Sequence, residues 1–150
     1  MNRSLSDQEG GFSPDLLPHG QTARLVHQVV RSEPTLIDVV CIVPAEHPLA
    51  SEGRAPAFLG LEMGAQAAAT LEAIGRRRDS GTAGPRIGYL VRVSEATFLA
   101  ADLPTETTLD VSACLEGSAP PLAIYRISVS QSGIELLNAT LSTYCEGPNR

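Results

Sequence analysis

The sequence is short of positive charge and of long apolar runs. It has 11 Lys and Arg residues against 17 Asp and Glu residues, which gives a formal net charge of −6. Phosphate binding requires a positive surface, so nucleic acid is not expected as the main partner. No apolar stretch approaches the length of a membrane span, and the first residues lack the basic and apolar segments of a secretory signal. We therefore expect no membrane partner and a cytoplasmic location.

Cysteine is also scarce. Cys41, Cys114 and Cys145 are the only cysteines in the sequence, and their spacing does not match a zinc site. No other cluster of residues predicts a metal, a nucleotide or an organic cofactor, so no cofactor is expected. Cys41 and Cys114 fall in strand-like runs, where cysteine usually behaves as a small buried apolar residue. A catalytic thiol is not expected, because no cysteine lies in a basic setting.

The chain has enough apolar residues for one compact domain. Its 150 residues are 43% apolar, which is sufficient for a real core. Residues 1–13 are predicted to form a flexible polar tail, residues 14–146 a single domain, and residues 147–150 a short C-terminal tail. The sequence shows no internal repeat and no second domain.

Residues 57–77 predict one long helix. The segment has no proline and no β-branched run, alanine is its commonest residue, and Pro56 precedes it. Three arginines close it, where the helix dipole favours cations. Apolar residues cover nearly its whole circumference, so the helix must be buried on most sides. A sheet wrapped around the helix is the simplest way to bury it in a chain of this size.

The remaining segments supply that sheet. Runs rich in Val, Ile and Leu predict strands at 24–30, 36–43, 86–100, 107–116, 122–131 and 134–144. Residues 44–56 predict a loop, and residues 117–121 and 131–133 predict turns between antiparallel strands. The order of two strands, one long buried helix and four strands predicts an α+β hotdog fold, with a central helix wrapped by a curved antiparallel sheet.

Several motifs resemble those of bacterial 3-hydroxyacyl-carrier-protein dehydratases. Leu16-Leu17-Pro18-His19 resembles the Leu-Pro-His opening of that family, and the run from Pro85 to Pro104 resembles its next strand. The active-site run of the family has a loop His, then Pro at the helix start, then Glu and Ala-Gln on the helix. Here the matching residues are His47, Pro56, Glu62 and Ala65-Gln66.

A second set of motifs looks closest to one branch of this superfamily. The set consists of Glu52-Gly53-Arg54-Ala55-Pro56-Ala57, Gly60-Leu61-Glu62 and Ala65-Gln66. That branch contains dehydratases of aryl-polyene and related pigment pathways. The resemblance therefore implies dehydration of 3-hydroxyacyl thioesters on acyl carrier protein to 2-enoyl thioesters, in fatty-acid-like, aryl-polyene or polyketide biosynthesis.

This chemistry needs a base for a carbon-bound proton, an acid for the leaving hydroxyl and a donor for the enolate-like oxygen. His47 suits the base, and Glu62 suits the acid because burial on an apolar helix should raise its pKa. The backbone N–H groups of Ala57 and Phe58, at the helix start, suit the oxygen. Gln66 lies one turn after Glu62 and suits a role in orienting it. In the family, His and Glu come from opposite subunits, so the resemblance implies a homodimer or a heterodimer with a paralogue.

Structural interpretations stay open for each of these residues. His47 also fits an exposed loop residue, in which case His19 is the reserve base. Glu62 also fits a structural hydrogen bond, and Gln66 fits a partner for nearby backbone groups. His27 lies in a predicted strand and has no chemical context.

The basic and small residues of the helix have two interpretations each. Arg76, Arg77 and Arg78 fit a solvated helix end or, with Arg86, a landing site for an acidic carrier protein. Gly60 and Gly64 are four positions apart and predict close packing on one helix face, rather than a ligand site.

Two functions compete with dehydration. One is a hotdog acyl thioesterase, in which Glu62 activates water and His47 is not needed. The other is a catalytically silent hotdog subunit that pairs with an active paralogue. The pairing of His47 with Glu62 favours dehydration.

Overall fold

A computed structural model describes residues 23–81 and 88–146 of the chain. The expected tails and the expected start of the domain at residue 14 lie outside these residues. In chain order the elements are β1 (Val26–Glu33), β2 (Leu36–Cys41), β3 (Arg54–Pro56), α1 (Leu59–Ser80), β4 (Gly88–Phe98), β5 (Asp102–Pro104), β6 (Leu109–Ala119), β7 (Leu122–Gln131) and β8 (Ile134–Cys145).

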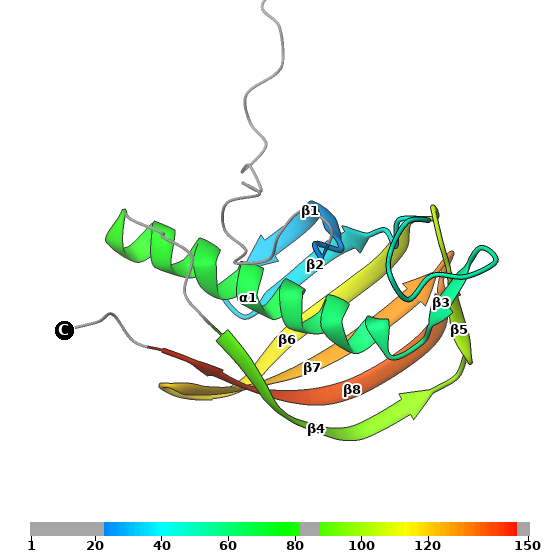
Figure 1. The fold of residues 1–150 in the computed structure, drawn as a ribbon. Coiled ribbons are helices and arrows are strands. Elements are labelled where there is room, and N and C mark those ends of the chain that lie inside the picture. The colour runs from blue at the N-terminus through cyan, green and yellow to red at the C-terminus, as the bar shows by residue number, and fades with distance from the viewer. Residues whose placement is uncertain (1–22, 82–87, 147–150) are drawn as a thin grey trace, which may run out of the picture.

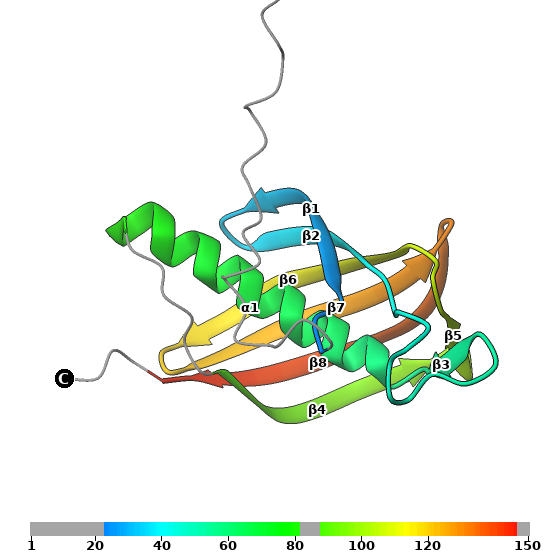
Figure 2. The ribbon, with the colours of Figure 1, turned by 45° about the horizontal axis from the view of Figure 1, so that its top comes forward.

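One curved sheet wraps around one long helix, as the sequence predicted (Figure 1). Six strands lie in the order β1-β2-β6-β7-β8-β4, and each is antiparallel to its neighbours. Figure 2 shows α1 crossing the concave face of the sheet, with β1 at one edge and β4 at the other. The helix and the concave face together enclose the core.

The inner face of the sheet carries the alternation that the sequence predicted. Along β6, Leu109, Val111 and Ala113 are buried, whereas Asp110 between them is exposed. Alternate residues of a strand point to opposite faces, so one face of β6 packs on α1 and the other faces outward. Cys41 is completely buried on β2, as expected, but Cys114 of β6 is only half-buried.

The N-terminal half of α1 lies very close to the sheet. A Cβ atom added to Gly60 would lie 2.2 Å from Leu137, and one added to Gly64 would lie 2.7 Å from Ile127. Any larger residue would therefore push the helix away from β7 and β8. The predicted packing role of both glycines is confirmed.

The helix begins and ends slightly later than its composition predicted. Leu59 rather than Ala57 is its first residue, because residues 54–56 form β3 and the N–H of Ala57 faces the carbonyl of Ala101 at 3.4 Å. At its other end Gly81 has a left-handed φ of 70° and donates its N–H to the carbonyl of Arg77 at 3.0 Å. Glycine adopts this conformation without steric strain, so it ends the helix.

Two local predictions were wrong. Residues 44–56 were expected to be loop throughout, yet β3 pairs with β5 in a separate two-stranded sheet, and Arg54 forms an ion pair with Asp102 across it. Residues 117–121 were expected to be a turn, but β6 continues to Ala119 and pairs with β7 through a bulge next to Gly117. The turn itself is therefore limited to Pro120 and Pro121.

Candidate active site

His47 lies in the loop that connects β2 to β3. Its N–H donates to the carbonyl of Pro44 at 3.0 Å, and its own carbonyl accepts the N–H of Ala50 at 2.9 Å. These two turns fix the backbone on both sides of the imidazole. The side chain is half-buried and lines a cavity of about 440 Å³ between this loop and the start of β1.

Glu106, which the sequence analysis did not identify, holds this loop in place. Its carboxylate Oε1 accepts the N–H of Ala45 at 2.6 Å, and its own N–H donates to the carbonyl of Val43 at 2.8 Å. Glu106 has a φ of 55°, a backbone conformation that is uncommon for residues other than glycine. Two hydrogen bonds between segments distant in sequence therefore hold Glu106 in this conformation and tie the start of the His47 loop to it.

The ring of His47 is also fixed by a backbone group. The N–H of Leu49 donates to Nδ1 of His47 at 3.1 Å. A neutral imidazole carries its proton on one nitrogen, so an Nδ1 that accepts a bond places the proton on Nε2. In this arrangement Nε2 is a donor. To act as a base through Nε2, the ring must first release the N–H of Leu49.

Glu62 lies in the first turn of α1 and is half-buried. Its Oε1 accepts a hydrogen bond from Nε2 of Gln66, one helical turn later, at 3.1 Å. A carboxylate in such a partly apolar setting is costly unless its oxygens have partners. The predicted contact between Gln66 and Glu62 is therefore present.

Gln66 itself is completely buried and satisfies backbone groups at the start of the sheet. Its Oε1 accepts the N–H of Leu25 at 2.8 Å, and its Nε2 also donates to the carbonyl of Ala23 at 2.8 Å. Gln66 thus makes the contacts that both interpretations require. The same amide ties α1 to the segment before β1 and donates a hydrogen bond to the carboxylate of Glu62.

The predicted oxyanion donors differ in their surroundings. Ala57 is buried, and its N–H already faces the carbonyl of Ala101. Phe58 occupies the position before the helix, and its side chain is 53% exposed. Of the two, Phe58 therefore has the more accessible position at the positive end of the helix dipole.

Within one chain, His47 and Glu62 line different cavities. The cavity beside His47 is completed by residues of β1, by Glu46 and by Glu106, whereas Glu62 lines a smaller cavity between α1 and the neighbouring ends of β4 and β8. Neither of these two cavities is lined by both of the residues that the sequence predicted to catalyse dehydration.

Comparison with known proteins decides the family. The model of the ApeP-like family, described as ApeP dehydratase, matches residues 13–149, which is nearly the whole chain. The chain belongs to the ApeP-like dehydratase family. Membership confirms the predicted enzyme class and the predicted resemblance. No curated protein matches the sequence significantly.

Solved structures confirm the hotdog fold of this ApeP-like dehydratase. The dehydratase heterocomplex ApeI:P from Xenorhabdus doucetiae is 19% identical with a TM-score of 0.79, and the match covers 89% of this chain and 90% of that chain. A hypothetical thioesterase with coenzyme A from Streptococcus pneumoniae TIGR4 is 13% identical with a TM-score of 0.59, covering 82% and 90%. The virulence protein Cj0977 from Campylobacter jejuni is 13% identical with a TM-score of 0.62, covering 88% and 92%. At these identities the likeness is one of fold.

The sequence contains two histidines besides His47. His19 lies outside the described residues. His27 is exposed on β1 and lines the same cavity as His47, so it does have a chemical context that its position in the sequence did not reveal. The side chains of the described residues form no group of three or more His, Cys, Asp or Glu that would hold a metal ion.

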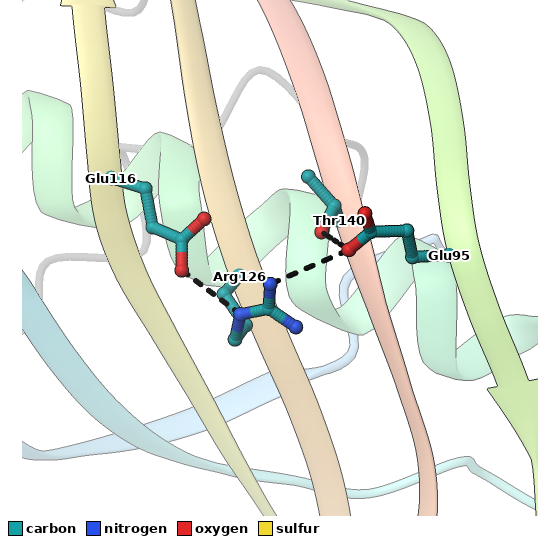
Figure 3. Close-up of polar contacts among 4 residues, drawn as sticks. All are labelled: Glu95, Glu116, Arg126 and Thr140. Atoms are coloured by element: carbon teal, nitrogen blue, oxygen red, sulfur yellow. Dashed lines mark hydrogen bonds and ion pairs between the residues drawn. The ribbon is translucent and has the colours of Figure 1, made fainter.

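The arginines of this ApeP-like dehydratase are unequally available to a partner. Arg126 lies on the outer face of the sheet, away from α1, between two glutamates (Figure 3). Its Nε donates to Glu116 at 2.9 Å and its Nη2 lies 3.4 Å from Glu95, which also accepts the hydroxyl of Thr140. The hydrogen bond to Glu116 and then the negative charge of Glu116 raise the pKa of Arg126 above its ordinary value. Arg126 therefore stays charged, and its charge is balanced by the two glutamates.

Only some of the predicted docking arginines lie exposed at the surface. Arg77 and Arg78 are exposed in the last turns of α1, whereas Arg76 is half-buried. None of the ion pairs between described residues involves Arg77 or Arg78. Arg86 lies outside the described residues. No helix of the described chain is long and apolar enough to cross a membrane.

Proposed function

We propose that this chain removes water from 3-hydroxyacyl groups carried as thioesters on acyl carrier protein. In this reaction the proton on the carbon next to the thioester carbonyl leaves to a base, and the carbon–oxygen bond at the third carbon breaks. The hydroxyl takes up a proton and departs as water, so that a 2-enoyl thioester remains. Membership of the ApeP-like dehydratase family supports this assignment, and His47 and Glu62 are the groups that we assign to the two proton transfers.

The observation that carries the proposal is the separation of His47 and Glu62. Each lines a different cavity of the described chain, which favours a site that is completed by another subunit. We propose that a second hotdog subunit completes the site, so that the His47 of one subunit meets the carboxylate on the central helix of the other. The active unit is then a dimer.

The free edge of β4 supports such a dimer. β4 is the last strand of the sheet, and every residue from Gly88 to Phe98 is exposed except the half-buried Ser94. Tyr89, Leu90 and Val91 are 48%, 41% and 54% exposed. A long apolar strand with an unpaired edge is normally covered by another chain. The dehydratase from Xenorhabdus doucetiae is a heterocomplex, so the second subunit is either a copy of this chain or a paralogue.

We place the docking surface for acyl carrier protein at the C-terminal end of α1. Arg77 and Arg78 are the exposed cations there, and an acidic chain needs a local basic patch to meet an acidic carrier. We further propose that the reaction serves a fatty-acid-like or aryl-polyene pathway in the cytoplasm.

A mass-spectrometric assay on 3-hydroxyacyl groups loaded on carrier protein tests the proposed reaction. The chain is assayed alone and with each co-encoded hotdog protein, because the second subunit is either a copy or a paralogue. Loss of the mass of one water from the acyl group is the expected result. Loss of the whole acyl group would identify a thioesterase, and no change under any pairing would identify a silent subunit.

A further inference from the structure

Two neighbouring cavities lie along α1 beyond Glu62. A cavity of about 90 Å³ is lined by Glu62, Ala65, Ala69 and Glu72 of the helix and by the adjacent ends of β4 and β8. These four positions follow the i, i+3 and i+4 spacing of one helix face. Glu72 is ten positions after Glu62, so the two lie about 15 Å apart along the helix at its rise of 1.5 Å per residue.

The second of these cavities is larger. This cavity has a volume of about 800 Å³ and lies between the last turns of α1 and the ends of β6, β7 and β8. Glu72, Tyr144 and Cys145 line both cavities, which makes them neighbours along one groove. Between its two glutamates the groove is lined on the helix by Ala65 and Ala69, whose methyl groups offer an apolar surface to an acyl chain.

A carboxylate stands at the far end of this apolar groove. The hydroxyl of Tyr125, which is 1% exposed, donates to Oε1 of Glu72 at 2.7 Å. Burial and then the charge of Glu72 raise the pKa of Tyr125, so the phenol keeps its proton and remains a donor. Tyr125 thus fixes one oxygen of Glu72. Oε2 is not used in any hydrogen bond between described residues, and it is an acceptor for a ligand.

We propose that Glu72, held by Tyr125, is a specificity-determining residue. It binds the far end of the acyl chain and selects chains that end in a hydroxyl. The inference rests on the proposed function, because it takes the acyl group to react beside Glu62. It also takes the pantetheine arm to reach Glu62 from outside this groove, which leaves the groove to the acyl chain. An apolar chain then lies along Ala65 and Ala69, and its terminal hydroxyl donates to the carboxylate of Glu72. A chain that ends in a methyl group offers no donor to Oε2 of this half-buried carboxylate and displaces water from it. Sites built to bind a hydroxyl group reject analogues that lack it for this reason.

The experiment compares two 3-hydroxyacyl pantetheine thioesters of equal length, one with a terminal hydroxyl and one with a terminal methyl. Both reach about 15 Å from the reacting carbons. Turnover is measured on the dimer by mass spectrometry. Binding is measured by calorimetry with the two matching amide analogues, which cannot react. The expected preference for the hydroxyl chain is roughly 10- to 100-fold in both kcat/KM and affinity, the range of a hydrogen bond to a charged group.

The decisive variant is the double substitution Glu72→Leu/Tyr125→Phe. It removes both polar partners together, and replacing both partners of a bond by apolar groups is often nearly neutral for stability. We expect the variant to lose the preference for the hydroxyl chain and to dehydrate the methyl chain faster than the parent protein does, because the unpartnered carboxylate is gone. Glu116→Gln, on the outer face of the sheet, is the matched control and should retain the preference.

Two results would overturn the inference. One is equal affinity of the parent protein for the two amide analogues. The other is a preference that persists in the double variant with an unchanged Tm. If neither thioester loses water but the affinities still differ, the proposed reaction is wrong, whereas the selection of the terminal hydroxyl by Glu72 is supported.

Discussion

The side-chain amide of Gln66 lies 3.1 Å from the carboxylate of Glu62 and at the same time holds both Leu25 and Ala23 at the start of the sheet. The position of the candidate acid is thus coupled to the docking of the helix. Gln66→Met keeps the length of the side chain and removes all of these bonds. We expect the free energy of unfolding to fall by about 1–3 kcal/mol, because buried backbone groups lose their partners.

The same variant should change catalysis in a way that lost stability alone does not explain. An N–H donor favours the ionised form of a carboxylate, so the limb of the pH–rate profile that reports Glu62 should move to higher pH in Gln66→Met. The profile is measured well below the Tm of the variant. An unmoved limb would leave Gln66 with a purely structural role.

His47→Ala and Glu62→Ala should each lower kcat about 10²- to 10⁴-fold, the usual effect of removing a positioned acid or base. If the active dimer consists of two copies of this chain, mixing the two inactive variants should restore part of the activity, because one intact pair is rebuilt in the mixed dimer. Mixed dimers that form and remain inactive would place both residues in one subunit. Full activity of His47→Ala would show that His47 is not the base and would make His19 the next candidate.

The bond from the N–H of Leu49 to Nδ1 of His47 makes a prediction that can be measured directly. In ¹⁵N NMR spectra of the isolated chain near pH 8, the His47 ring should show the proton on Nε2. Addition of the second subunit should shift the ring towards the Nδ1–H form if His47 is the base. A ring that stays in the Nε2–H form within an active dimer would make His47 a hydrogen-bond donor, and Glu62 the group that removes the proton.

Two double variants with the same change in net charge can separate carrier docking from the chemical step. Arg77→Gln/Arg78→Gln should raise KM for carrier-bound substrate by about 2- to 30-fold, since each of two exposed ion pairs contributes roughly 0.2–1 kcal/mol. KM for a pantetheine thioester should not change. Arg31→Gln/Arg126→Gln removes two arginines that already have acidic neighbours, and it should affect neither substrate. An equal rise with both substrates would count against docking at α1.

Alkaline pH should destabilise the fold through Tyr125. Its pKa is raised above its ordinary value of 10.0, mainly by burial and then by Glu72. The folded state therefore keeps a proton that the unfolded chain loses above pH 10. Stability from this group is complete below that pH and declines as pH rises, by about 1.4 kcal/mol per pH unit. Urea unfolding between pH 9 and 11.5 should show this decline, and Tyr125→Phe should reduce it.

The sequence was a good guide where structure is local. The bounds of β7 were predicted correctly, because alternating apolar residues between turn residues define a strand without reference to other segments. The helix was recognised from its alanines and its lack of β-branched residues. The close packing of Gly60 and Gly64 followed from their spacing on one face.

What the sequence did not reveal depends on distant pairings. β3 exists because residues 54–56 meet residues 102–104, and three residues are too few to show a strand pattern. Glu106 lies 61 positions from Ala45, whose N–H it accepts, and nothing in its neighbourhood marks it as a support of the His47 loop. Tyr125 and Glu72 are likewise 53 positions apart. Such partners become visible only when the sheet has brought them together.

The exposed edge of β4 also bears on how the protein is made in a cell. A freshly synthesised chain carries an apolar strand whose backbone groups are open to any other strand, including another copy of itself. Chaperones and proteases act on chains in this state. The abundance of the protein should then follow the supply of its second subunit more closely than its own rate of synthesis, and surplus copies should be degraded or accumulate as insoluble aggregates.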